Sequence, residues 1–145
     1  MADRHWLGVA IGLSLRCPPS HSAFSVGALV VDRAGAVLGT GFSREYDETD
    51  HAEEVALRRA GGASLAGATL YSSLEPCVRR ASRPVTCAEL MLAVGVHRVV
   101  IAWREPPLFV PGGGADWLSA HAVTVVEYPD LAAAARVANR HLVPG

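Results

Sequence analysis

The chain opens with apolar positions at helical spacing and then changes to short β-type runs. Over residues 3–16, apolar side chains recur every three or four positions, as in an amphipathic helix, and Pro18-Pro19 stop the pattern. Two β-rich runs follow, at residues 24–31 and 36–42, and turn-forming residues separate them at 32–35. This pattern predicts one helix followed by a β-hairpin.

The rest of the chain alternates strands with helices. We expect further strands and helices in the order 51–60 (helix), 69–73 (strand), 86–94 (helix), 98–103 (strand), 115–120 (helix), 123–128 (strand) and 131–142 (helix). Asp50 is the predicted N-cap of the first of these helices, and Gly61-Gly62 end it. Such alternation after a hairpin predicts an α/β domain with one mixed, roughly five-stranded sheet, partly parallel and covered by helices on both faces.

Length and charge narrow the class of protein. With 145 residues, half of them hydrophobic, the chain can bury one core, and we expect residues 1–145 to form a single domain. Thirteen basic and 14 acidic residues give a net charge of −1, so no global field attracts a polyanion or an acidic membrane. No stretch approaches the ~20 apolar residues of a membrane span, and the start lacks a signal-peptide pattern. We therefore expect a cytoplasmic protein that binds neither a long nucleic acid nor a membrane.

Candidate chemistry gathers in three short segments. His51-Ala52-Glu53 is followed by Pro76-Cys77 and, after nine intervening residues, by Cys87. Catalytic zinc has three protein ligands and keeps one position open for water, whereas structural zinc closes its shell with four. We therefore predict Zn²⁺ bound by His51, Cys77 and Cys87, with the positive ends of two helices favouring the thiolates. Glu53 is left free of the metal to move protons.

This arrangement matches the general pattern of zinc deaminases, H-x-E followed by P-C-x-x-C, except in the spacing of the cysteines. The stretches 67–87 and 95–101 resemble the riboflavin-pathway pyrimidine deaminases of the cytidine-deaminase superfamily, whose segment between the cysteines is also expanded. Weaker similarity at Val26-Gly27 and at the glycine loop 112–114 extends the resemblance over most of the chain. The resemblance implies a cytidine-deaminase-like three-layer α-β-α fold and a homo-oligomer, such as a dimer.

The chain also departs from that family's pattern. Phe24-Ser25 replace the usual Asn-Pro of the first strand, and residues 104–107, Arg-Glu-Pro-Pro, replace Asp-Pro-Asn-Pro after the fourth. The segment between the cysteines holds nine residues, where the family usually has eight. These departures leave the substrate open. The reductase domain often fused to such deaminases does not follow within the 145 residues, so we expect only the deamination step.

Four residues are candidates for substrate binding. Arg79, Arg80 and Arg83 flank the second metal ligand, where guanidinium groups suit a phosphate, although a solvated loop face is an equal alternative. Phe24 either packs against a substrate ring or fills the core beneath the hairpin. Cys17 has no partner motif and is interpreted as a buried thiol outside the site.

The predicted reaction is hydrolytic deamination, in which a ring amine is replaced by a carbonyl and ammonia is released. Glu53 would take a proton from water and deliver protons to the ring nitrogen and the departing amine. The expected substrate is a small amino-pyrimidine nucleotide of the riboflavin type. The alternatives are a nucleoside or free base of cytidine, cytosine, guanine or pterin type, and, outside enzymes, a non-catalytic zinc-binding module.

Overall fold

One mixed β-sheet forms the centre of the protein. The computed structural model describes the chain except for residues 1, 62–64, 79, 81–82, 110–111 and 144–145. In the described part, the sheet has five strands in the order β2-β1-β3-β4-β5. Their bounds are β1 (Gly27–Val31), β2 (Val37–Phe42), β3 (Thr69–Ser72), β4 (Arg98–Ile101) and β5 (Thr124–Glu127). β1 is antiparallel to β2 and β3, and β3, β4 and β5 are parallel, which confirms the predicted hairpin and the mixed sheet.

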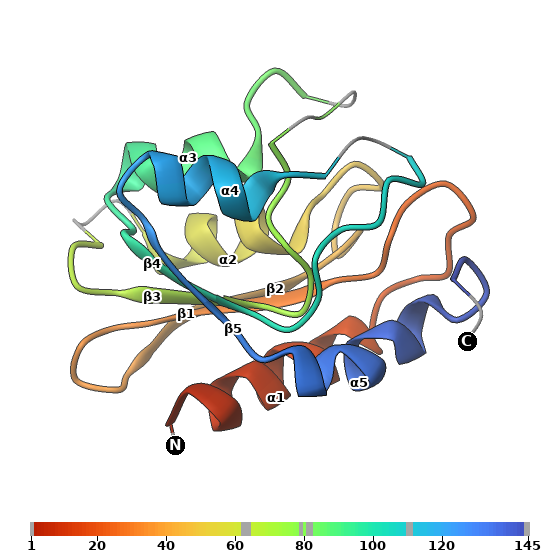
Figure 1. The fold of residues 1–145 in the computed structure, drawn as a ribbon, viewed down its shortest axis with the longest axis horizontal. Coiled ribbons are helices and arrows are strands. Elements are labelled where there is room, and N and C mark those ends of the chain that lie inside the picture. Colours follow the sequence, from red (N-terminus) through yellow and green to blue (C-terminus); the bar gives the residue numbers. More distant parts are fainter. Residues whose placement is uncertain (1, 62–64, 79, 81–82, 110–111, 144–145) are drawn as a thin grey trace.

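Helices cover both faces of this sheet (Figure 1). α2, α3 and α4 lie on one face, and α1 and α5 lie on the other. The helices are α1 (Ala2–Ser14), α2 (Ala52–Ala60), α3 (Cys87–Val94), α4 (Gly114–Ala120) and α5 (Ala132–Arg136). The expected α/β class and three-layer α-β-α arrangement are confirmed.

The core lies on both faces of the central strands. Every residue of β1 and β3 is buried, as are the last three residues of β4. Burial on both faces is typical of central strands in sheets that helices cover on two sides, and it explains the nearly all-apolar sequence of β4. Within the described residues, no helix has both the length and the apolar character needed to cross a membrane.

Helix α2 packs directly on the backbone of β2. A Cβ atom added at Gly39 would lie 2.3 Å from the carbonyl oxygen of Ala56, and one added at Gly41 would lie 2.5 Å from that of Ala52. Both distances are too short for any side chain, so glycine is required for this close approach. β2 therefore fixes the distance between the sheet and the start of α2, where His51 lies.

The structure corrects one predicted cap. The N-cap of α2 is His51, and not Asp50, and the carboxylate of Glu54 accepts a hydrogen bond of 2.9 Å from the His51 amide. The side chain of Asp50 instead accepts hydrogen bonds from the amides of Tyr46 and Asp47 in the preceding loop. An aspartate side chain close to a helix start can accept hydrogen bonds from the amides of the preceding loop as well as from those of the helix.

The last predicted helix, 131–142, is also not continuous. A 3₁₀ turn at Pro129–Leu131 precedes α5, and another follows it at Val137–Asn139. The buried side chain of Asn139 accepts a hydrogen bond from the amide of Ser25 and donates one to the carbonyl oxygen of the same residue. These hydrogen bonds attach the 3₁₀ turn after α5 to the segment that precedes β1.

Candidate active site

Three metal-type ligands converge at the start of two helices. The Nδ1 atom of His51 lies 3.5 Å from the sulfur of Cys77 and 3.4 Å from that of Cys87. All three ligand atoms lie within 4.8 Å of one another, and they form the one such group found among the residues that the structure describes. The structure thus brings together the three ligands that the sequence predicts.

The donor set fits zinc. Two thiolate sulfurs and one imidazole nitrogen are ligands that Zn²⁺ prefers, and three protein ligands are the number found in catalytic sites. No fourth described His, Cys, Asp or Glu belongs to the group, and Glu53 is outside it. A metal bound here would keep a position open for water.

The local fold supports the thiolate form of Cys77, whereas the hydrogen bond with Cys77 and burial raise the pKa of the Cys87 thiol. Cys87 is the first residue of α3, and its amide donates a hydrogen bond of 3.3 Å to the sulfur of Cys77. The amide of Ala88 donates to the carbonyl oxygen of Cys77 at 3.1 Å. The hydrogen bond from the Cys87 thiol, followed by the contact with His51, holds the pKa of the Cys77 thiol below its usual range. Backbone amides at the start of a helix favour negative charge in the same way.

Glu53 lies beside this group in the interior of the protein. Its side chain belongs to the first turn of α2, it is only 3% exposed, and it lines the pocket that contains His51 and Cys77. Burial raises the pKa of Glu53 to about 7. A carboxyl group with a pKa near neutrality can both accept and release a proton at physiological pH, as general acid/base catalysis requires.

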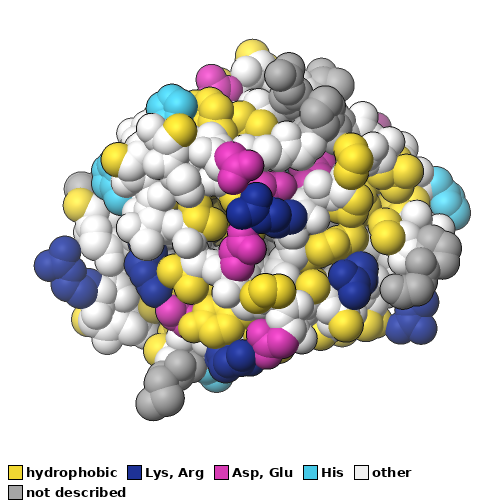
Figure 2. Space-filling model, in the orientation of Figure 1, with side chains coloured by type: hydrophobic (Ala, Val, Ile, Leu, Met, Phe, Trp, Pro, Cys, Tyr) yellow, Lys and Arg dark blue, Asp and Glu magenta, His cyan; other side chains and the backbone are white. Residues whose placement is uncertain are grey.

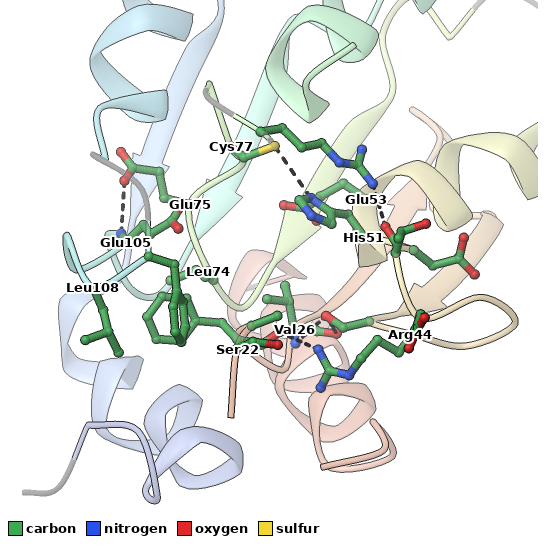
Figure 3. Close-up of a pocket in the computed structure, with 18 residues that line it drawn as sticks. Ser22, Val26, Arg44, His51, Glu53, Leu74, Glu75, Cys77, Glu105 and Leu108 are labelled. Carbon is green, nitrogen blue, oxygen red and sulfur yellow. Dashed lines mark hydrogen bonds between the residues drawn. The ribbon is translucent and has the colours of Figure 1, made fainter. Parts of the chain in front are cut away.

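His51, Cys77 and Glu53 open into a single pocket (Figure 3). Its volume is about 590 Å³, within the usual range for small-molecule sites. His51 and Cys77 face one another on one side of it in Figure 3. The loops around the two ligands supply one part of its wall, and the segments at residues 22–26 and 105–109 supply the rest.

Phe24 is in contact with both the pocket and the core. Its ring packs edge-to-face against Trp103, with ring centroids 5.5 Å apart, and against Phe109, at 5.1 Å. Phe24 is only 7% exposed, and it lines the pocket. Phe24 therefore fills the core and also lines the pocket, and its contact with a substrate ring stays a prediction.

Arg80 is buried in an ion pair. Its side chain is 2% exposed, and its guanidinium group lies 2.6 Å from the carboxylate of Glu54 in α2. It also donates a hydrogen bond of 2.7 Å to the carbonyl oxygen of Thr49. Arg80 lines the pocket, but its charge is balanced by Glu54.

Arg83 is partly exposed and faces the same carboxylates. Its guanidinium group lies 3.1 Å from Glu54 and 3.3 Å from Asp50, and its side chain is 29% exposed. Arg79 lies outside the described residues. The phosphate contact expected of these arginines therefore stays a prediction, with the carboxylates as competitors.

Two pocket residues were not singled out from the sequence. The guanidinium group of Arg44 donates to the carbonyl oxygens of Pro18 and Phe24 and to the hydroxyl of Ser25, and the Arg44 backbone adopts a φ of 58°. Glu105 lines the pocket opposite Arg44 in Figure 3. The sequence could have pointed to Glu105, because this residue lies in the segment after β4 that departs from the family pattern. Arg44 had no such signal.

Comparison with known proteins places the chain in a family. Residues 1–103 match the model described as the cytidine and deoxycytidylate deaminase zinc-binding region. The chain therefore belongs to the cytidine and deoxycytidylate deaminase zinc-binding family.

Its relatives identify the branch of that family. The chain is 38% identical over 122 residues to a diaminohydroxyphosphoribosylamino-pyrimidine deaminase of Schizosaccharomyces pombe, covering 81% of this chain and 30% of that protein. It is 42% identical over 100 residues to the riboflavin biosynthesis protein RibD of Mycobacterium tuberculosis, covering 69% of this chain and 28% of that protein. The structure of Acinetobacter baumannii RibD matches with a TM-score of 0.83 and 32% identity, over 97% of this chain and 39% of that one. The resemblance to riboflavin-pathway deaminases is thus confirmed, although the chain spans less than a third of these two curated relatives.

Proposed function

We propose that this protein is a zinc-dependent hydrolytic deaminase of a small amino-pyrimidine nucleotide. The observation that carries the proposal is the group His51, Cys77 and Cys87, with the buried carboxyl of Glu53 beside it at a pocket that His51, Cys77 and Glu53 line. A structural zinc site has no use for an unliganded buried acid next to the metal. This argues against a non-catalytic zinc-binding module.

The chemistry follows from these side chains. Zinc, held by the three ligands, would supply the Lewis acidity that makes water a nucleophile near neutral pH. Glu53 takes the proton that the attacking water loses and passes it to the ring nitrogen. It then takes the proton of the hydroxyl group on the tetrahedral ring carbon and passes it to the departing amine. The oxygen of water ends in the ring carbonyl, and the amine leaves as ammonia. The pKa of about 7 suits Glu53 to both directions of transfer.

The substrate class rests on the relatives and on the pocket. The S. pombe relative is named for a phosphoribosylamino-pyrimidine, and a pocket of about 590 Å³ is large enough for a ring with a sugar phosphate. We extend the proposal to a nucleotide of this diaminopyrimidine type. A nucleoside or free base is the alternative, favoured by the engagement of Arg80 and Arg83 with Glu54.

The setting of the enzyme completes the proposal. We place it in the cytoplasm, because two of its cysteines are needed as free thiolates. Basic side chains are interspersed with acidic and hydrophobic ones on the face drawn in Figure 2, which supports a small-molecule substrate over a long nucleic acid. A homodimer and a single domain over residues 1–145 are part of the same proposal, and sedimentation and limited proteolysis test them.

Ammonia release tests the proposed activity. The zinc-loaded protein is assayed with aminated pyrimidines, purines and pterins, each with and without a phosphate group. Release from an amino-pyrimidine nucleotide by the wild-type protein, and not by Glu53→Gln, is the expected result. Activity on none of these compounds would contradict the proposal, and preference for an unphosphorylated compound would favour the alternative.

A further inference from the structure

Five acidic side chains line the pocket, and four of them are accounted for. Glu48 is exposed at the rim, and Asp50 accepts hydrogen bonds from loop amides. Glu53 lies beside the metal ligands, and Glu75 accepts hydrogen bonds from two backbone amides, at 2.9 and 2.7 Å. Glu105 remains. None of the described residues donates a hydrogen bond to its carboxyl group or forms an ion pair with it.

The backbone of Glu105 is held firmly in place. Its amide donates one of the hydrogen bonds to Glu75, whose second carboxylate oxygen binds the amide of Ala115 in α4. On the other side, the Glu105 carbonyl oxygen lies so close to Gly112 that a Cβ atom there would approach it to 2.8 Å. The segment after β4 therefore presents the Glu105 side chain to the pocket from a fixed position.

A negative charge at Glu105 is costly without a ligand. Burial, followed by the nearby Cys77, Glu53 and Glu75, raises the pKa of Glu105 to about 8. A ligand that donates an N–H to this carboxylate favours the charged form and offsets part of that cost. The site thus suits a ring with an N–H on the edge that faces Glu105.

We propose that Glu105 is a specificity-determining residue that accepts a hydrogen bond from a ring N–H next to the carbon that carries the amine. In an isocytosine-type ring, one ring nitrogen beside this carbon carries a hydrogen and the other has a free lone pair. Glu105 binds the first, and Glu53 protonates the second. In a cytosine ring the amine-bearing carbon is flanked by a nitrogen without hydrogen and by a C–H, so Glu105 gains no donor. The inference rests on the proposed function, and it names the ring type that the pocket selects.

Binding and turnover test this selection separately. The binding of isocytosine and of cytosine is measured by calorimetry on the zinc-loaded protein that carries Glu53→Gln, with and without Glu105→Gln. We expect Glu105→Gln to weaken isocytosine binding roughly tenfold to 100-fold, the value of one charge-assisted hydrogen bond, and to leave cytosine binding within about twofold. In otherwise wild-type protein, kcat/KM for the diaminohydroxypyrimidine nucleotide should fall by a similar factor, whereas that for deoxycytidine monophosphate should not.

Two further variants keep the test decisive. Glu127→Gln makes the same chemical change at an exposed residue outside the pocket, where Glu127 pairs with Arg104, and it should leave both ligands unaffected. Glu105→Asp keeps the charge, and it should retain more of the preference than Glu105→Gln. Zinc content and circular dichroism verify that each variant is folded and loaded.

The outcomes separate the inference from the proposed function. Equal binding of the two rings by the parent protein, or an unchanged preference in Glu105→Gln, would overturn the role of Glu105 even if the enzyme deaminates the diaminopyrimidine. If the wild-type protein releases no ammonia from any compound, the proposed function fails. In that case the difference between isocytosine and cytosine binding, measured by calorimetry, still decides whether Glu105 selects the type of ring.

Discussion

The carboxylate of Glu54 binds the buried guanidinium group of Arg80 at 2.6 Å and the backbone amide of His51 at 2.9 Å. One side chain thus links the segment between the two cysteines to His51, the proposed zinc ligand. Since Glu54 directly follows Glu53, the same contact fixes the first turn of α2, which carries the proposed proton shuttle. The relative position of the ligand-bearing segments depends on this ion pair.

Breaking this ion pair should destabilise the protein. Arg80→Met leaves the carboxylate of Glu54 without its main partner, and we expect a loss of about 3 kcal/mol in the free energy of unfolding. The double variant Arg80→Met/Glu54→Gln should lose less than the sum of the two single variants, because no buried charge is left unpaired. Urea denaturation of the four proteins measures the coupling. Additive effects would show that the pair does not act as a unit.

Zinc removal should loosen the same region. We expect about one zinc per chain, bound by one nitrogen and two sulfurs, with water as the fourth ligand. A chelator should lower Tm, because the metal ties the starts of α2 and α3 together, and added zinc should restore it. Metal analysis and absorption-edge spectroscopy check the ligand set. Four protein ligands would exclude the catalytic interpretation.

Glu53→Gln should separate zinc binding from turnover. The amide keeps the size of the side chain but cannot shuttle protons, so we expect a loss in kcat of ~10²–10⁴-fold or more. Zinc content and Tm should stay close to those of the wild-type protein. Single-turnover kinetics on the active substrate provides the measurement, and a variant with near wild-type rates would refute the role given to Glu53.

The arginines between the cysteines should determine whether the enzyme prefers a phosphorylated substrate. If Arg79, Arg80 and Arg83 bind the substrate phosphate, alanine substitutions should lower kcat/KM about tenfold for a phosphorylated substrate. The kcat/KM for the dephosphorylated form should not change. Salt should reduce the preference by screening. Arg83 is the sharpest single test, since it is partly exposed, whereas Arg80 is buried. A normal preference in Arg83→Ala and in the triple variant would assign these side chains to the loop structure alone.

Far from the site, Asp3 should make stability depend on pH. Its carboxylate accepts hydrogen bonds from Arg98, at 2.7 and 3.0 Å, and from the hydroxyl of Tyr71, at 2.7 Å. The hydrogen bond with Arg98 is the main cause that holds the pKa of Asp3 below its ordinary value of 3.8. The contact therefore stabilises the protein above pH 3.8, and this stabilisation is lost as the pH falls through the lower pKa of the folded state.

Asp3→Asn reveals this contribution. It should lower the free energy of unfolding by about 1 kcal/mol at pH 7, and the difference from the wild-type protein should shrink as the pH falls below 4. Asp130→Asn is the control, because Asp130 pairs with Arg4 at the exposed surface. Denaturation curves at several pH values provide the comparison. A difference that stays constant with pH would show that the charge of Asp3 is not its source.

The sequence predicted the parts of the site that depend on local pattern. The hairpin, the starts of α2 and α3 to within one residue, and the residues that come together as candidate metal ligands all follow from hydrophobic spacing, turn residues and motif spacing. They are local signals, because each needs only a few neighbouring residues. Glycine at position 95, where φ is 90°, ends α3 as the sequence indicates.

Contacts between distant segments could not be predicted in this way. Arg80 and Glu54 are 26 positions apart, and Ser25 and Asn139 are 114 apart. In the sequence, Arg80 belongs to a run of charges that is typical of a solvated loop. Only the fold brings it to Glu54, and only the fold reveals that Glu105 is the pocket carboxyl, apart from the exposed Glu48 at the rim, without a described partner.

Gly41 couples the edge strand β2 to the position of the candidate site, although β2 does not line the pocket. Gly41 does not line the pocket, yet even a methyl group there would push on Ala52, the residue between His51 and Glu53. For the proposed deaminase, a change on the outer strand would then alter turnover by shifting the proposed metal ligand and proton shuttle together. Adjusting rate or specificity in this protein need not begin with residues that line the pocket, because the spacing between strand and helix is itself a variable of the reaction.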